Sequence, residues 1–151
     1  MKILIFGLPG SGKTTLAKPL AELLGGIHIN ADEVRTEYDD WDFSPEGRMR
    51  QANRMRHLSD GVVKAGAIAV TDFVCPTGAA RQAFDADFTI WMDTIKEGRF
   101  EDTNKMFEKP VNDSMHCDVD YHVSEWFEDT HQTLMEVISK WMERKLNDRV
   151  S

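Results

Sequence analysis

Residues 1–15 read MKILIFGLPGSGKTT, and this stretch decides the fold. The apolar run Ile3–Phe6 predicts a buried strand, and the Gly7-x-x-x-x-Gly12-Lys13-Thr14 pattern after it is the Walker A signature of a nucleoside-triphosphate P-loop. Glycines let the N–H groups of such a loop converge on phosphate oxygens, and the helix that follows adds its positive dipole end. The alternative is a glycine-rich turn without a ligand, but a bare turn does not need the Lys-Thr pair. We therefore expect ATP and Mg²⁺ as cofactors.

Each position of the loop has an expected role. Lys13 is expected to reach the β- and γ-phosphates and to act as a catalytic cation, while the Thr14 hydroxyl is the expected Mg²⁺ ligand. The expected ATP-binding residues are Gly7, Pro9, Gly10, Ser11, Gly12, Lys13, Thr14 and Thr15.

Composition sets the limits on domains and partners. A chain of 151 residues predicts a single domain over residues 1–151. The net charge of −8, from 26 acidic and 18 basic residues, disfavours nucleic acid and membrane surfaces as partners because both are polyanions. The apolar start is too short for a signal peptide or a membrane span, and Cys75 and Cys117 form no metal or disulfide pattern. A cytoplasmic protein is expected, and homodimerisation is left open.

Apolar runs that alternate with helical stretches predict an α/β fold. We expect a P-loop NTPase three-layer sandwich whose parallel sheet of about five strands is covered on both faces. Residues 96–116 show no clear hydrophobic periodicity and carry several cations. These features fit two interpretations equally well: a lid that closes on the triphosphate, and an irregular surface segment. Strands are expected at residues 3–6, 27–29, 68–70, 88–92 and 121–123, and helices over 13–24, 44–66 and from about Phe127 to Lys145.

Candidate functional residues stand where the strands end, since ligands bind at the carboxyl ends of such sheets. Asp32, after the second strand, could orient Mg²⁺ or accept a proton from an attacking hydroxyl, or could simply complement a helix dipole. Asp72 ends the third strand in the Walker B position, so the two acids are rival candidates for the metal and the base. Arg35 could clamp an anionic acceptor or pair with Asp39 at the surface.

Two further residues follow from position along the chain. Arg48 is the one arginine of the helix after Ser44 that is expected near the cleft. His28 lies within the second expected strand and is interpreted as a core residue.

Ordered motifs over residues 1–95 resemble the adenylyl-sulfate kinase family. The P-loop GLPGSGKTTLA is similar to that of the family, and residues 30–35 (NADEVR) occupy the place of its Asp-Gly-Asp-Asn-Ile-Arg segment. Residues 42–48 (DFSPEGR) match Gly-Phe-Ser-x-x-x-Arg, residues 72–76 (DFVCP) match Ser-Phe-Ile-Ser-Pro, and residues 92–94 (MDT) match Val-Asp-Thr.

The resemblance implies a kinase that moves the ATP γ-phosphoryl group to the 3′-hydroxyl of adenosine 5′-phosphosulfate, a small-molecule nucleotide acceptor. It implies that Asp32 is the general base and that Arg35 and Arg48 hold the phosphosulfate. It also implies that Phe43 stacks on the acceptor adenine, with Phe73 near it.

Three departures from the family pattern keep alternatives open. Asn30 replaces the first acid of the family's pair, Asp72 replaces a serine and is a candidate to restore the lost carboxylate, and the family's lid is not recognisable in residues 96–116. The alternatives are a P-loop kinase of another hydroxyl acceptor (a nucleoside, a sugar or a polynucleotide end) and a nucleotide-binding module with little transfer activity.

Overall fold

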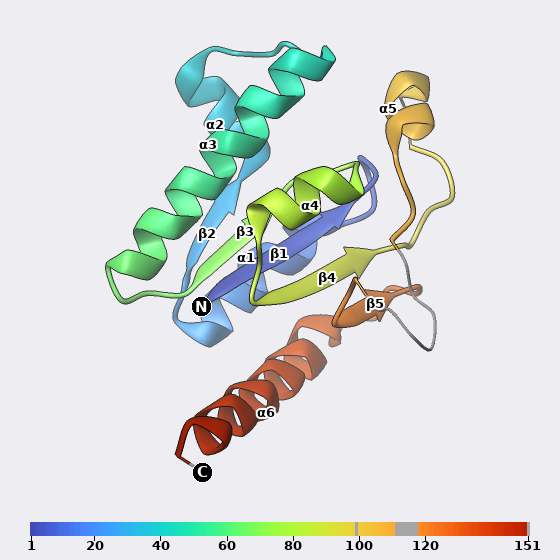
Figure 1. Ribbon diagram of the computed structural model, residues 1–151. Coiled ribbons are helices and arrows are strands. Elements are labelled where there is room, and N and C mark those ends of the chain that lie inside the picture. Colours follow the sequence, from blue (N-terminus) through green and yellow to red (C-terminus); the bar gives the residue numbers. More distant parts are fainter. Residues whose placement is uncertain (99, 111–117, 151) are drawn as a thin grey trace.

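The computed structural model describes residues 1–98, 100–110 and 118–150, and within them strands and helices alternate along the chain (Figure 1). The strands are β1 (Lys2–Gly7), β2 (Ile27–Asn30), β3 (Ala69–Asp72), β4 (Phe88–Met92) and β5 (Tyr121–Val123). The helices are α1 (Lys13–Leu24), α2 (Ala31–Tyr38), α3 (Pro45–Lys64), α4 (Gly78–Phe84), α5 (Glu101–Met106) and α6 (Thr130–Val150).

The strands form one sheet in the order β2-β3-β1-β4-β5, and every neighbouring pair is parallel. β1 lies at the centre, where Ile5 is in register with Asp72 of β3 and Gly7 is in register with Met92 of β4. The carboxyl ends of β1, β3 and β4 therefore meet at one edge of the sheet, beside the P-loop. The predicted parallel α/β fold of the P-loop NTPase type is confirmed.

Alternation along β1 divides the core into two halves. Ile3 and Ile5 face the side covered by α1 and α6, with Leu134 of α6 fully buried there. Leu4 and Phe6 face the opposite side, which is covered by α2, α3 and α4. Figure 1 shows α1 behind the sheet and α3 and α4 in front of it, so the three-layer arrangement is confirmed as well.

The elements differ from expectation at several places: α2 was not among the expected helices, and β3 runs to Asp72, past the expected end at residue 70. α4 was not predicted, and α5 forms inside the segment 96–116, of which residues 99 and 111–116 lie outside the described residues. The expected start of the last helix near Phe127 is wrong, because α6 begins at Thr130 and Phe127 is exposed before it. Cys75 is a buried free thiol, and Cys117 is outside the described residues. None of the helices in the described ranges has both the length and the apolar character needed to cross a membrane.

Candidate functional site

The loop between β1 and α1 has the backbone that its sequence predicts. Gly10 and Gly12 have φ angles of 87° and 94°, the left-handed region that glycine adopts without strain. The Ser11 N–H donates to Leu8 O at 3.1 Å, and the Thr94 hydroxyl donates to Ser11 O at 2.7 Å, which ties the loop to the end of β4. Among the described residues, Ser11 Oγ is the buried side-chain oxygen left without a hydrogen-bond partner. The loop thus holds a defined curve, and the Ser11 hydroxyl within it is left unpaired in the part of the chain that the structure describes.

Lys13 is the cation of this loop. Its Nζ donates to Leu8 O at 3.0 Å, so the side chain folds back over the loop. Burial lowers the pKa of Lys13 to about 8, although Asp72 and Asp32 act in the opposite direction. A partly desolvated ammonium group gains strongly from an anionic ligand, which restores the charged form. The electrostatics of the loop therefore favour a phosphate at Lys13.

Asp72 is the centre of a hydrogen-bonded cluster at the edge of the sheet. The Thr14 hydroxyl donates to Asp72 Oδ1 at 3.1 Å, and His28 Nε2 contacts Asp72 Oδ2 closely. Asn30 Nδ2 donates to Thr14 Oγ1 at 3.0 Å and lies 3.3 Å from Asp72 Oδ1, while its Oδ1 caps α2 by accepting the Glu33 N–H. The Asp72 carboxylate is buried and is held against the P-loop hydroxyl.

Asp32 has a different environment from its rival. It lies in the first turn of α2, is exposed to solvent, and faces the same cavity as the P-loop. Its charge is close enough to Lys13 to raise the pKa of that side chain. The Asp72 carboxylate is thus engaged by Thr14, His28 and Asn30, whereas the Asp32 carboxylate faces the open cavity.

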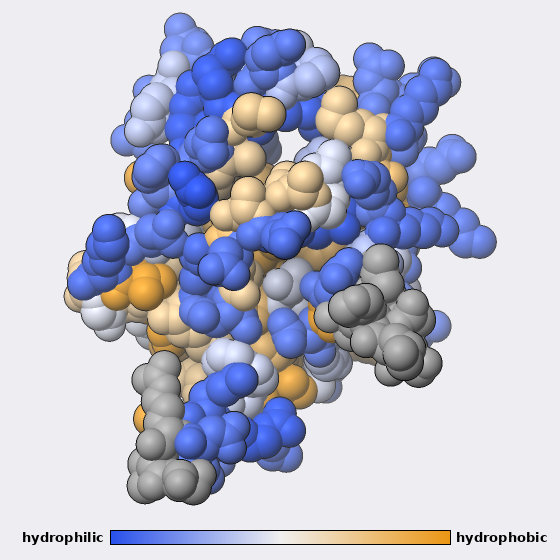
Figure 2. All heavy atoms as spheres, in the orientation of Figure 1, coloured by the Kyte–Doolittle hydropathy of each residue, from blue (hydrophilic) through white to orange (hydrophobic). Residues whose placement is uncertain are grey.

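A cavity of about 740 Å³ extends from the P-loop to the N-terminal end of α3 and to α5. Trp41, Phe43 and Phe100 line it, and each is at least half exposed. Figure 2 shows pale-orange apolar atoms between hydrophilic rims in the upper part of this face. Charged groups are added by Lys13 and Arg48 and by the acids Asp32, Asp72 and Asp102. The cavity therefore offers a phosphate end and an aromatic end.

The two predicted acceptor arginines play different structural parts. Arg48 lines the cavity and reaches across it, with Nε donating to Phe43 O at 3.0 Å and Nη2 donating to the Thr103 hydroxyl of α5 at 2.8 Å. Arg35 is buried, does not line the cavity, and donates to the carbonyl oxygens of Asp40 and Asp42 at 2.9 and 3.3 Å. Its guanidinium carbon lies 4.4 Å from the centre of the Phe43 ring, so it supports that ring from beneath. The alternative of a surface pair with Asp39 is not the arrangement observed.

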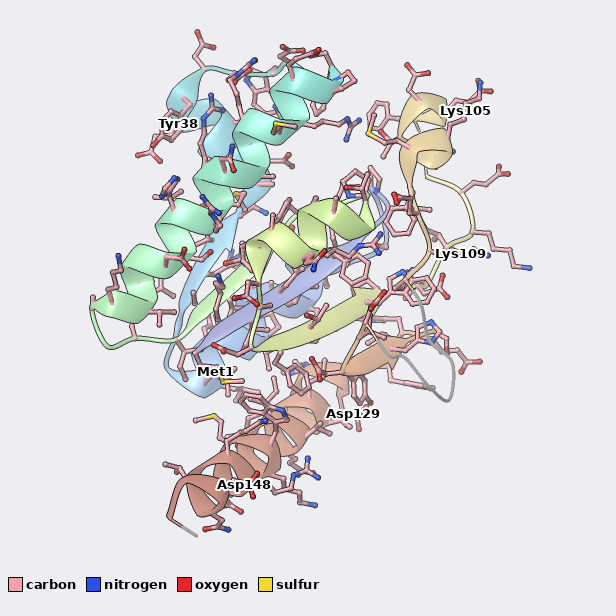
Figure 3. All side chains as sticks on the ribbon, viewed as in Figure 1. Met1, Tyr38, Lys105, Lys109, Asp129 and Asp148 are labelled. Carbon is pink, nitrogen blue, oxygen red and sulfur yellow. The ribbon has the colours of Figure 1, made fainter. Side chains whose placement is uncertain are left out.

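The structure brings most of the predicted site residues to this one cavity. Phe73 contributes to its wall but is buried and packs on Phe84, at 5.6 Å between ring centres. Of the cations expected on the lid, Lys105 pairs with Glu101 on the outer side of α5 (Figure 3), and Arg99 is outside the described residues. The lining residues that were predicted are Pro9, Gly10, Gly12, Lys13, Thr14, Thr15, Asp32, Phe43, Arg48, Asp72 and Phe73; Gly7, Ser11 and Arg35 lie outside the lining.

Sequence reasoning missed several residues of the site. Trp41, Phe100 and Thr103 stand in loops or a short helix, where no period marks them. The interpretation of His28 as a core residue is wrong, because its ring contacts Asp72 at the edge of the sheet and stays partly exposed. Within the described ranges, no three His, Cys, Asp or Glu side chains gather as a metal centre.

Known proteins resemble the chain at two levels. The adenylylsulphate kinase family profile matches residues 1–97. A probable adenylyl-sulfate kinase of Aeropyrum pernix is 37% identical over 81 residues, which cover 50% of this chain and 44% of that protein. The chain spans less than half the length of the curated relatives it matches first.

Solved structures extend the likeness of fold to nearly the whole chain. The Mycobacterium tuberculosis APS kinase in complex with AMPPNP and APS aligns with a TM-score of 0.67 and 17% identity, over 91% of this chain and 96% of that one. A Sinorhizobium meliloti gluconokinase aligns with a TM-score of 0.66 and 12% identity, over 97% and 96%. At these identities the two structures establish the shared fold alone.

Proposed function

The chain belongs to the adenylylsulphate kinase family, and from this membership we propose that it transfers the γ-phosphoryl group of ATP to the 3′-hydroxyl of adenosine 5′-phosphosulfate. The observation that carries the proposal is the continuous cavity that joins Lys13 and Thr14 to Phe43 and Arg48, with Asp32 on its wall. Such a cavity can hold a triphosphate and a purine-bearing acceptor together. Phosphoryl transfer depends mainly on that positioning and on charge neutralisation.

Each residue has a proposed part in the transfer. Lys13 neutralises charge that develops on the β- and γ-phosphates, and the N–H groups of the P-loop hold the same phosphates. The oxygen of the acceptor hydroxyl bonds to the γ-phosphorus, and the bond between the γ-phosphorus and the β-phosphate oxygen breaks, which releases ADP. Asp32 accepts the proton that the acceptor hydroxyl loses in this step. Phe43 provides a flat face for the acceptor base, and Arg48 an anion contact beside it. Arg35 acts only through Phe43, which it supports.

The residues around Thr14 fit Mg²⁺, which takes hard oxygen ligands. The Thr14 hydroxyl would bind the ion, and the Asp72 carboxylate, 3.1 Å from that hydroxyl, would add its negative charge. When bound, the ion neutralises and orients the phosphate oxygens. Asn30 and His28 keep the carboxylate beside the hydroxyl.

A second candidate is a kinase of an uncharged hydroxyl acceptor such as a nucleoside or a sugar. The observation that favours it is that the described residues place few cations on the acceptor side of the cavity. Arg35 is committed to backbone carbonyl groups, and Arg48 shares its end of the cavity with the carboxylate of Asp102.

One experiment separates these candidates. ADP release from MgATP is measured with a panel of acceptors at matched concentrations: adenylyl sulfate, adenosine, a pentose, a hexose and a polynucleotide 5′ end. We expect adenylyl sulfate to give the highest kcat/KM and mass spectrometry to find its phosphorylated product. Lys13→Ala is the control and should lose at least about tenfold in rate, since each tenfold corresponds to only about 1.4 kcal/mol. A higher kcat/KM with another acceptor refutes the substrate, and nucleotide binding without transfer to any acceptor leaves the binding-module alternative.

A further inference from the structure

Both oxygens of the Asp72 carboxylate are held, and they are held by different partners. Oδ1 receives the Thr14 hydroxyl at 3.1 Å and lies 3.3 Å from Asn30 Nδ2. Oδ2 is contacted closely by His28 Nε2, and its next partner is Asn30 Nδ2 at 3.4 Å. Without the imidazole, Oδ2 would keep only that long contact. His28 is therefore the close partner that holds Oδ2 in place.

The position of this histidine is set by the sheet. β2 is an edge strand whose register places Asn30 beside Asp72 and His28 beside Val70. Side chains two residues apart on a strand point to the same face, so His28 and Asn30 approach Asp72 from one side. The His28 side chain is 17% exposed and that of Asp72 is 3% exposed, so the contact is largely sheltered from water. A sheltered hydrogen bond to a carboxylate is one of the stronger contacts in proteins.

The charge at this edge also differs from the pattern that the family motif carries. That motif has its first acid where this chain has Asn30, and a serine where this chain has Asp72. In this chain the carboxylate of Asp72 stands beside the P-loop hydroxyl, and an acid at position 30 as well would bring two like charges together. Asn30 avoids this repulsion, and its amide donates to both Thr14 and Asp72. The carboxylate of this edge stands on β3, and its supporting donors come from β2.

We propose that His28 is a positioning residue that locks the Asp72 carboxylate beside Thr14 and so prepares the site for a magnesium–nucleotide complex. The inference deepens the proposed function on its nucleotide side and does not depend on which acceptor is used. His28 touches neither phosphate nor metal in this scheme. Its effect should therefore be specific to the magnesium-dependent part of nucleotide binding.

The test measures ADP affinity by titration calorimetry, once with Mg²⁺ and once in EDTA. We expect His28→Ala to reduce the gain in affinity that Mg²⁺ gives by about tenfold, in line with the loss of other hydrogen bonds that orient metal-side ligands. Its affinity for ADP in EDTA should remain that of the wild type. His28→Gln, which keeps a donor on a side chain of similar length, should recover part of the loss. The exposed His57 on α3 supplies the matched control, because His57→Ala should leave both affinities unchanged.

Two further arms keep the result interpretable. In an Asp72→Asn background, His28→Ala should have no added effect on the magnesium-dependent gain, since the carboxylate it positions is gone. In the ligand-free protein, nitrogen-15 NMR should find a His28 Nε2 proton that is protected from exchange in the wild type and not in Asp72→Ser. This measurement does not need the His28→Ala variant, so it tests the inference even if that variant fails to fold. An equal loss of ADP affinity in both buffers, or an Nε2 proton that Asp72→Ser does not affect, would overturn the inference. If the wild type binds no ADP in either buffer, the proposed function fails and the inference fails with it.

Discussion

Gly47, in the first turn of α3, tests how the loop before α3 positions the aromatic end of the cavity. A Cβ at this residue would lie 2.1 Å from the carbonyl oxygen of Asp42 and 2.7 Å from its carbonyl carbon. Both atoms are backbone, so Gly47→Ala must push α3 and the loop apart by roughly 1 Å to restore van der Waals distances. Such overpacking costs about 1–3 kcal/mol. Because Asp42 precedes Phe43, we expect a raised acceptor KM and an unchanged KM for MgATP.

Gly61, on the same helix, supplies the matched control. A Cβ there would meet nothing within 4 Å, so Gly61→Ala changes helix propensity alone. Alanine is favoured over glycine by about 1 kcal/mol, and for a chain of this size 1 kcal/mol moves the Tm by roughly 2–4 °C. Gly61→Ala should therefore raise the Tm. The Tm of Gly47→Ala should lie below that of Gly61→Ala by an amount that corresponds to the cost of the steric overlap. Thermal unfolding and acceptor kinetics check both. Equal Tm and equal acceptor KM for the two variants would refute the close packing of Gly47 on Asp42.

Three other predictions address the charged residues. Asp32→Asn should lower kcat, measured by turnover, while leaving the nucleotide Kd unchanged. Asp72→Asn should weaken magnesium-dependent nucleotide binding, measured by calorimetry. The reverse pattern would exchange the roles of the two acids. Arg35→Ala should cost about 1.5–3 kcal/mol of stability in denaturant unfolding, because two carbonyl groups lose a charged donor, and an unchanged midpoint would contradict that support. Hydrogen bonds from Arg50 and Arg54 hold the pKa of Asp40 well below its ordinary 3.8. The ionised Asp40 side chain therefore stabilises the fold fully above pH 3.8, and this stabilisation is lost as the pH falls toward the lowered pKa. The Tm advantage of the wild type over Asp40→Asn should shrink on acidification, and a Tm difference that stays constant with pH would argue against the ion pairs.

Local chemistry explains which parts of the site could be predicted. Gly10 and Gly12 must adopt left-handed φ angles and Lys13 must follow them, so the P-loop carries its conformation in its own sequence. The acid at the end of β3 was also predictable, because parallel strands bring their carboxyl ends to one edge. The strands themselves follow from apolar runs, which are buried on both faces in β1.

The remaining parts depend on contacts between distant residues. Strand alternation shows that His28 and Asn30 share a face, but not that a carboxylate from β3 lies on it. Its position in the sequence places Arg35 about one turn into α2. Its guanidinium nevertheless turns to the carbonyl groups of the loop after α2, and the sequence of that loop has no periodic pattern from which the contact could be predicted. α4 has small alanines and buries only Arg81 and Phe84, too few residues to give a helical pattern.

α5 and the residue before it form one wall of the cavity, and this wall bears on which acceptor the protein would select. The family profile ends at residue 97, just before Phe100, Asp102 and Thr103 enter the lining. The nucleotide end and this part of the acceptor end therefore belong to separate stretches of chain, joined across the cavity by the hydrogen bond from Arg48. Under the proposed function, we expect substitutions in α5 to alter acceptor choice while β1 and its loop stay intact. A chimaera that exchanges residues 100–106 alone would be the smallest graft with which to redirect specificity.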